Sequence, residues 1–253
     1  MSLHRFFLTE ALAAGEGARV RLPLDSEDCH HAVSVLRLRV GEKIEGVEPD
    51  GGVWCARVEA ADRDALVATL LTYTTPVARR RPQVTLVQGV AKGEKMDAIV
   101  RQAVEVGADA VLPVLTERSI VRLDERKRAE RGERWQRIAK SAAEQAHRTR
   151  VPQVAHPADW REAREQLAGA DAVVVLWEDE HATSLAEALA PLRGRTDAHV
   201  ALVVGPEGGL SPDEVAVLRE AGATVATLGE PILRTETAAV VAVALAIHEL
   251  ERA

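Results

Sequence analysis

Short apolar runs separated by turn residues characterise the chain between residues 5 and 74. They predict strands at 5–8, 18–22, 43–47, 52–59 and 66–74. The stretch PDGG at 49–52 joins two of these strands, because glycine readily supplies the positive φ of a tight hairpin turn. One helix, capped by Asp25 or Ser26 and apolar at several positions from 32 to 38, interrupts the strands. The pattern predicts a small β-barrel.

The pattern changes after TTPVARRRP at 74–82, a proline- and arginine-rich stretch typical of a linker. Beyond it, apolar strands alternate with helices, which indicates a parallel sheet covered on both faces. We expect strands at 84–90, 110–114, 172–177, 199–204 and 224–228, and helices at 93–106, 125–147, 182–190, 211–221 and 235–251. The sequence therefore predicts two domains, residues 1–76 and 77–253, the second with an α/β fold.

The last predicted helix is apolar on nearly every side between residues 238 and 247. Such a helix must be buried on most of its faces. Two arrangements satisfy this: a helix at the centre of one subunit's core, or a helix that also packs against a second subunit. The pattern alone leaves both open.

The composition bears on where the protein is located and on whether it binds a metal. The 253 residues contain no apolar run of about 18, the length that a membrane-spanning helix needs, and the N-terminus lacks the regions of a secretion signal. We therefore expect a cytoplasmic protein with no membrane contact. Cys29 and Cys55 are the only cysteines, and the eight histidines show no metal-ligand spacing, so no metal site is expected.

The net charge of −7 conceals an uneven distribution along the chain. Residues 76–150 carry 17 Lys and Arg against 10 Asp and Glu, a net charge of +7, whereas residues 151–253 carry 7 against 17. A basic segment between acidic ones slightly favours a polyanionic partner, although a solvated helix face is the commoner reason for such a run.

The most informative stretch is ALVVGPEGGLSPDE at 201–214, an apolar run followed by a glycine-rich turn and a capped helix start. Glycines beyond the carboxyl end of a strand let the backbone approach a ligand. The stretch is neither G-x-G-x-x-G nor G-x-x-x-x-G-K-[ST], so it predicts neither a dinucleotide fold nor a phosphate loop. LWEDE at 176–180 and LGEPILR at 228–234 would lie beside it if the three strands are adjacent, which makes a pocket the better interpretation.

Several longer motifs carry a family resemblance over nearly the whole chain, in the right order. They are HRFFL at 4–8, HHAVSVLRLRVGEKI at 30–44, KGEKMDAIVRQAVEVGAD at 92–109, LPVLTERS at 112–119, RWQRIAKSAAEQAHRTRVP at 134–152, LVVGPEGGLSPDE at 202–214 and LGEPILRTETA at 228–238. In these motifs the chain resembles the 16S ribosomal RNA uridine-N3 methyltransferases of the trefoil-knot (SPOUT) superfamily.

The resemblance implies a C-terminal α/β domain with a parallel sheet and a deep trefoil knot, an N-terminal PUA-like β-barrel, and an obligate homodimer. It implies S-adenosyl-L-methionine as cofactor and 16S ribosomal RNA or the small ribosomal subunit as partner. The implied cofactor contacts are Leu176, Gly205, Pro206, Glu207, Gly208, Leu228, Ile232, Leu233 and Arg234.

Methylation at N3 of uridine requires loss of the N3 proton, so the site needs a base or a cation that stabilises the uridine anion. Arg234 is the candidate cation, and Glu236 or Glu207 the candidate proton acceptor. An ion pair between Arg234 and Glu236 that merely rigidifies the loop is an equal alternative. The alternative for Glu207 is a loop or cap acceptor.

Arginines in both domains are candidates for binding RNA phosphates, although an individual arginine is more often a solvated surface residue. The candidates are Arg5, Arg37, Arg39, Arg79, Arg80, Arg81, Arg118, Arg148 and Arg150. Two other functions stay open at this point. One is a knotted methyltransferase acting on another RNA position, such as a ribose 2′-hydroxyl, and the other is an RNA-binding factor for ribosome assembly.

Overall fold

The computed structural model describes residues 3–77, 81–119 and 123–252. Its backbone contacts divide the chain into two compact units. The first contains residues 1–78 together with 143–151, and the second contains residues 79–142 and 152–253. The assignment of residues 143–151 to the first unit is a feature that the linear strand and helix pattern did not predict.

The predicted strands of the first unit form one five-stranded sheet in the order β1-β3-β4-β5-β2, in which β1 pairs parallel with β3 and the other pairs are antiparallel. The strands are β1 His4–Phe7, β2 Arg19–Arg21, β3 Lys43–Val47, β4 Val53–Ala61 and β5 Leu66–Thr74. Alternate positions of β4 and β5 point into a core that includes Phe6, Ile44 and Leu70. Such alternation is the geometry of a strand with one buried face, and the strands lie where the short apolar runs predicted them.

The single helix of the first unit differs from its prediction. It begins as expected, with the Asp25 carboxylate accepting a hydrogen bond from the Asp28 backbone N–H at 2.7 Å, and runs as α1 Ser26–His30. It then continues as a π-helical turn, η1 His31–Val35, closed by a bond from Leu36 N–H to the His31 carbonyl. Arg37 follows with a left-handed φ of 54°, which ends the helix before Leu38.

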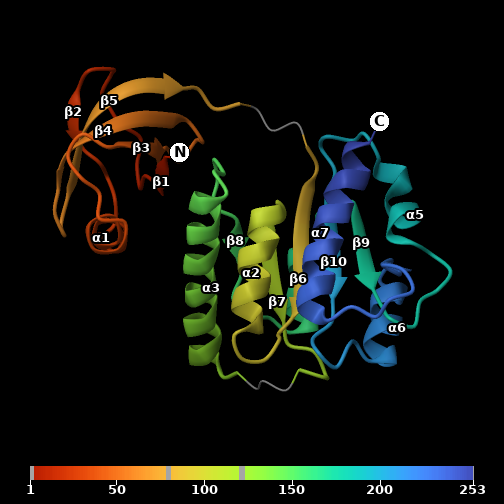
Figure 1. The fold of residues 1–253 in the computed structure, drawn as a ribbon. Helices are drawn as coiled ribbons and strands as arrows, with labels where there is room; N and C mark the ends of the chain where they lie inside the picture. Colours follow the sequence, from red (N-terminus) through yellow and green to blue (C-terminus); the bar gives the residue numbers. More distant parts are fainter. Residues whose placement is uncertain (1–2, 78–80, 120–122, 253) are drawn as a thin grey trace. The chain divides into compact units, whose positions relative to one another are not determined.

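The second unit is built on a six-stranded sheet in the order β11-β9-β10-β6-β7-β8, in which every pair is parallel (Figure 1). The strands are β6 Gln83–Gly89, β7 Ala110–Val114, β8 Gln153–Val154, β9 Ala172–Leu176, β10 His199–Val204 and β11 Thr224–Ala226. The helices are α2 Lys95–Val106, α3 Glu125–Gln145, α4 Trp160–Gln166, α5 Leu185–Leu189, with the 3-10 turn η2 Ala190–Leu192, then α6 Pro212–Glu220 and α7 Thr235–Glu251.

Helices cover both faces of this sheet, as predicted. Helices α2, α3 and α7 lie along one face (Figure 1), where α2 and α7 pack closely on each other. The other face carries a core that includes Leu112, Val203 and, from α6, Leu218. Two elements were missed, β8 and α4. Strand β8 has two residues, and α4 buries only Ala163, so neither produces a periodic signal, although Asp159 caps α4 in a complete capping box.

The chain returns from the edge of the sheet to its centre between β11 and α7. Thr235, the first residue of α7, is buried, and its hydroxyl donates a hydrogen bond of 2.6 Å to the Gly205 carbonyl. The Gln88 side-chain amide donates to the same carbonyl at 3.2 Å, to the Thr235 hydroxyl at 3.0 Å and to the Gly89 carbonyl at 2.9 Å. This network joins β6, the loop after β10 and the start of α7, three segments that lie far apart in the sequence.

Candidate functional site

Three neighbouring parallel strands of the second unit end side by side. Val204 of β10 and Ala226 of β11 both pair with Leu176 of β9, so the strands reach the same level before their loops begin. Ligands of open α/β sheets bind beyond such carboxyl ends. The loops that follow these strands enclose a cavity of about 660 Å³. Ligand sites typically measure roughly 300–1,000 Å³, so the cavity suits a molecule of nucleoside size or larger.

The cavity brings together most of the residues that the resemblance implied for the cofactor. Eight of the nine line it: Leu176, Gly205, Pro206, Glu207, Leu228, Ile232, Leu233 and Arg234. Gly208 does not line it, because its Cα faces another way: an added Cβ would lie 3.2 Å from the Cβ of Arg118. Ile232 is 85% exposed, so the cavity has an apolar side chain at its open rim.

Two glycines of the GPEGG turn, Gly205 and Gly209, line the cavity and are also required by the turn itself. A Cβ on Gly205 would lie 2.8 Å from the backbone carbon of Gly209 and 2.9 Å from the amide nitrogen of Leu210. Gly209 has φ of +70°, and a Cβ there would come within 2.2 Å of a Glu178 carboxylate oxygen. Both glycines therefore allow the turn to fold tightly on itself and against the loop after β9.

The loop after β9 is fastened by a carboxylate. Glu180 accepts the backbone N–H of Ala182 at 2.8 Å, and the Arg219 guanidinium lies 3.5 Å away. These backbone hydrogen bonds, first that from Ala182, hold the pKa of the Glu180 carboxyl below its ordinary value despite some desolvation. Glu180 is therefore ionised at neutral pH. The stability that it contributes is present above the carboxyl's ordinary pKa and is lost as the pH falls through the lowered one.

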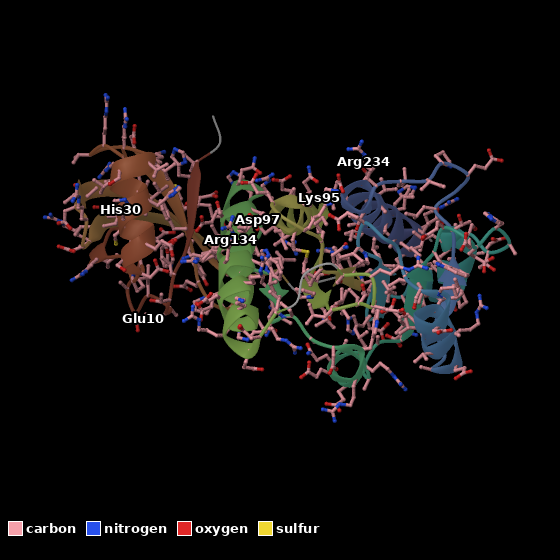
Figure 2. The ribbon with its side chains drawn as sticks, turned by 90° about the horizontal axis from the view of Figure 1, so that it is seen from below. Glu10, His30, Lys95, Asp97, Arg134 and Arg234 are labelled. Atoms are coloured by element: carbon pink, nitrogen blue, oxygen red, sulfur yellow. The ribbon has the colours of Figure 1, made fainter. Side chains whose placement is uncertain are left out.

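The two candidate proton acceptors, Glu207 and Glu236, both contact a lysine to which the sequence assigned no role. The Lys95 ammonium, at the start of α2, lies 3.4 Å from a Glu207 carboxylate oxygen and 3.6 Å from a Glu236 carboxylate oxygen. In the view of Figure 2, Lys95 lies between Arg234 and the ion pair of Asp97 with Arg134. The available signal was its place in the KGEKMD stretch of the family motif.

Arg234 does not form the expected alternative ion pair with Glu236. It is the N-cap residue of α7, its side chain is exposed, and it lines the cavity. Within residues 3–77, 81–119 and 123–252, its guanidinium has no hydrogen bond or salt bridge to protein. Arg234 is therefore available to a ligand, whereas Glu236 is held by Lys95.

Two of the arginines predicted to bind RNA, Arg5 and Arg81, form ion pairs and hydrogen bonds within the protein. The Arg5 guanidinium bonds to Glu45 at 2.7 Å and to the carbonyls of His147 and Arg148, and its side chain is only 9% exposed. Arg81 bonds to Asp109 and to the Gly107 carbonyl. These contacts give both residues a structural role and leave their guanidiniums few donors for a phosphate.

The other predicted arginines differ in availability. Arg37, Arg39 and Arg150 are exposed, and Arg118 is exposed but donates a hydrogen bond of 2.9 Å to the Gly208 carbonyl. Arg148 is half-buried. Arg79 and Arg80 lie outside the described residues.

Within the described ranges, no group of three or more His, Cys, Asp or Glu side chains is arranged to hold a metal ion. None of the helices in those ranges combines the length and the apolar character needed to cross a bilayer.

Comparisons with known proteins identify the family. The family described as an RNA methyltransferase domain matches residues 79–247, and the RNA methyltransferase PUA domain matches residues 24–71. Ribosomal RNA small subunit methyltransferase E of Bacillus subtilis is 30% identical over 230 residues, 90% of each chain. The Mycobacterium bovis protein of the same name is 38% identical over 227 residues, 87% of this chain and 83% of that one. The chain belongs to the ribosomal RNA small subunit methyltransferase E family.

A solved member of this family has the same fold. The Neisseria gonorrhoeae ribosomal RNA small subunit methyltransferase E, bound to S-adenosyl methionine, is 32% identical, and 96% of each chain superposes with a TM-score of 0.81. The predicted fold class is therefore confirmed: a parallel-sheet α/β trefoil-knot (SPOUT) methyltransferase domain preceded by a PUA-like domain. The return of the chain from β11 to Thr235 agrees with this fold.

The residues that line the cavity fit the cofactor of this family. S-adenosylmethionine carries a sulfonium and an ammonium, and the cavity is rich in carboxylates, with Glu178, Asp179, Glu207, Glu230 and Glu236 against two full cations, Lys95 and Arg234. The apolar side chains of Leu176, Leu228 and Leu233 provide surface for an adenine ring. S-adenosylmethionine is thus the cofactor that both the family and the cavity indicate.

Proposed function

We propose that the protein transfers a methyl group from S-adenosylmethionine to N3 of a uridine in 16S ribosomal RNA. The observation that carries the proposal is the cavity at the ends of β9, β10 and β11, which gathers eight of the residues that the family motif implies for the cofactor. When bound there, the cofactor supplies a methyl group on a sulfonium, which a nucleophile can displace. The protein must therefore align the acceptor nitrogen, exclude water and manage the N3 proton.

Arg234 has the position and the freedom to meet the acceptor. Its guanidinium lines the cavity and is not used by the protein among the described residues. We propose that it donates hydrogen bonds to the uridine carbonyl oxygens, where negative charge accumulates when N3 loses its proton. Of the carboxylates that line the cavity, we propose Glu207 or Glu236 as the acceptor of this proton, and the lining residues above as those that hold the cofactor.

We propose residues 1–76 as an RNA-binding PUA-like domain and residues 77–253 as the methyltransferase domain. Exposed arginines in both could bind phosphates: Arg37 and Arg39 in the first, Arg118 in the second, and Arg150 in the segment that packs with the first, where the half-buried Arg148 is a further candidate. Arg79 and Arg80 stay candidates from the sequence alone. Because the positive charge is local on a protein of net charge −7, the proposed target is a large folded one, the assembled or partly assembled small subunit in the cytoplasm.

We also propose a homodimer that uses helix α7. Its buried side faces the sheet, but its outer side is apolar too: Val241 is half-buried, Ala244 and Leu245 are exposed, and all three fall on one face. Leu245 is 41% exposed, and Val106 on the adjoining α2 is 36% exposed. A second copy of the chain would remove this surface from water.

The test is transfer of labelled methyl groups from S-adenosylmethionine to three RNAs in parallel: unmodified small subunits, naked 16S RNA and a short hairpin. We expect preferential labelling of the subunits. Cofactor binding measured by calorimetry accompanies the assay. Binding without transfer to any RNA would indicate an RNA-binding assembly factor, and equal rates on the hairpin would contradict the assembled target.

A further inference from the structure

Lys95 joins three elements around one charge cluster. It comes from the first residue of α2, Glu207 from the loop after β10, and Glu236 from the first turn of α7. Their side chains are 36%, 21% and 25% exposed, so the cluster is partly shielded from water. One ammonium between two carboxylates leaves the cluster one negative charge in excess. Such a cluster becomes neutral when it takes up one proton.

The two carboxylates are held in different ways. A Glu207 oxygen accepts the Lys92 backbone N–H at 3.2 Å in addition to the Lys95 contact. Glu236 accepts no hydrogen bond in the described part of the chain, and its oxygen nearest Lys95 is buried. Glu236 is therefore the carboxylate of the two whose hydrogen-bonding capacity the described residues leave unused, so it can accept the N–H of a bound base.

The cluster lies between two hollows of the second unit. Lys95 and Glu236 line the cofactor cavity and also a neighbouring cavity of about 480 Å³, whose other lining residues are Glu94, Asp97, Ala98 and Arg101. A group held in the second cavity would face the first across these two side chains. Five of the six residues that line the second cavity are charged, so a group held there would meet hydrogen-bond donors and acceptors.

We propose that Glu236 is the general base of the methyl transfer and that Lys95 is the positioning residue that holds its carboxylate ionised and oriented. This inference rests on the proposed function and assigns its proton-transfer step. The N3–H bond of the uridine breaks and its proton passes to Glu236. The nitrogen lone pair then forms the bond to the methyl carbon as the carbon–sulfur bond of the donor breaks, and a neutral thioether leaves.

The charged and titratable groups near Glu236 come from all the elements that line these two cavities with it. They are Glu94, Lys95, Asp97 and Arg101 at or on α2, Glu178, Asp179 and His181 in the loop after β9, Glu207 in the loop after β10, Glu230 in the loop after β11, and Arg234 at the start of α7 itself. Asp97 is paired with Arg134 and bonded to the Trp135 indole N–H at 3.0 Å, so its charge is already compensated. Lys95 is the cation in contact with Glu236, and its removal should make the carboxylate easier to protonate.

The experiment compares Glu236→Gln, Glu207→Gln, Lys95→Met and Lys95→Arg with the wild type. Two exposed positions provide matched controls, Glu220→Gln at the end of α6 and Lys127→Met on α3. Each full-length variant is checked for cofactor affinity by calorimetry. Turnover on small subunits is then followed from about pH 4.5 to pH 9, so that the range includes the ordinary pKa of a glutamate. The pH dependence of kcat reports groups of the bound complex.

We expect Glu236→Gln to lower kcat by about 100-fold or more, the usual effect of losing a general base, with cofactor affinity within about threefold of wild type. Glu207→Gln should lose much less. Lys95→Met should move the acid limb of the kcat profile to higher pH, because Glu236 then protonates more readily, and Lys95→Arg should restore it. The two controls should match wild type.

Several results would overturn the assignment. They are near-normal turnover of Glu236→Gln, a larger loss in Glu207→Gln, or an unshifted acid limb in Lys95→Met. Should Glu236→Gln fail to bind cofactor, Glu236→Asp supplies the second measurement: it keeps a carboxylate, and turnover equal to that of Glu236→Gln would also overturn the proposal. A wild-type enzyme that forms no 3-methyluridine would instead refute the proposed function.

Discussion

The contribution of the Thr235 hydrogen bonds to the free energy of unfolding can be measured by substitution. It is 7% exposed, and its hydroxyl donates to the Gly205 carbonyl and accepts from the Gln88 amide. Valine has nearly the same shape but makes neither bond. After Thr235→Val, the Gly205 carbonyl keeps the Gln88 amide at 3.2 Å, and that amide keeps the Gly89 carbonyl at 2.9 Å. None of these partners is therefore left wholly unsatisfied.

The expected loss is thus close to that of two ordinary hydrogen bonds, about 1–3 kcal/mol in the free energy of unfolding. For a chain of this size, each kcal/mol lowers Tm by roughly 2–4 °C. The assay is urea unfolding together with a thermal melt. Thr235→Ser, which keeps the hydroxyl, should recover most of the lost stability. Thr224→Val, at an exposed position of β11, should change stability by less than about 0.5 kcal/mol. A Thr235→Val protein as stable as that control would refute the role given to the network.

Three further predictions concern ligands and assembly. Arg234→Ala should lower kcat by about 100-fold, as loss of a donor to a developing anion does, while calorimetry shows a much smaller loss of cofactor affinity; equal losses would assign Arg234 to binding. Replacing Arg37 and Arg39 together with alanine should weaken RNA binding and reduce its salt dependence without changing the modified base, as filter binding and nucleoside analysis would reveal. Leu245→Glu should give a monomer mass by light scattering, whereas a wild-type monomer would contradict the proposed dimer.

Much of the fold was predictable because it is local. Short apolar runs between turn residues located the strands of the first unit, and apolar runs located five of the six strands of the second. The capping box at Ser211 fixed the start of α6. Adjacency of β9, β10 and β11, stated only as a condition from sequence, is confirmed by their pairing. The knot itself came from the family resemblance, since no periodic pattern encodes the order in which segments cross.

The site was predictable where it depends on motifs and not where it depends on packing. The loops around the cavity follow directly from the GPEGG and LGEPILR stretches. The Lys95 contacts to Glu207 and Glu236 arise from the packing of α2 against α7, which no local pattern specifies. In the same way, the sequence suggested that the Arg5 side chain is a free surface cation. Its acceptors are the carbonyls of His147 and Arg148, which follow the C-terminal end of α3 and lie far from Arg5 in the sequence.

The most direct test of the central claim is the chemical identity of the product. Small subunits lacking the modification would be incubated with the enzyme and S-adenosylmethionine, their 16S RNA digested, and the nucleosides separated and identified by mass spectrometry against synthetic standards. The account predicts one new nucleoside, 3-methyluridine, dependent on both enzyme and cofactor. A methyl group on a ribose, on another base or on another atom of uridine would contradict it.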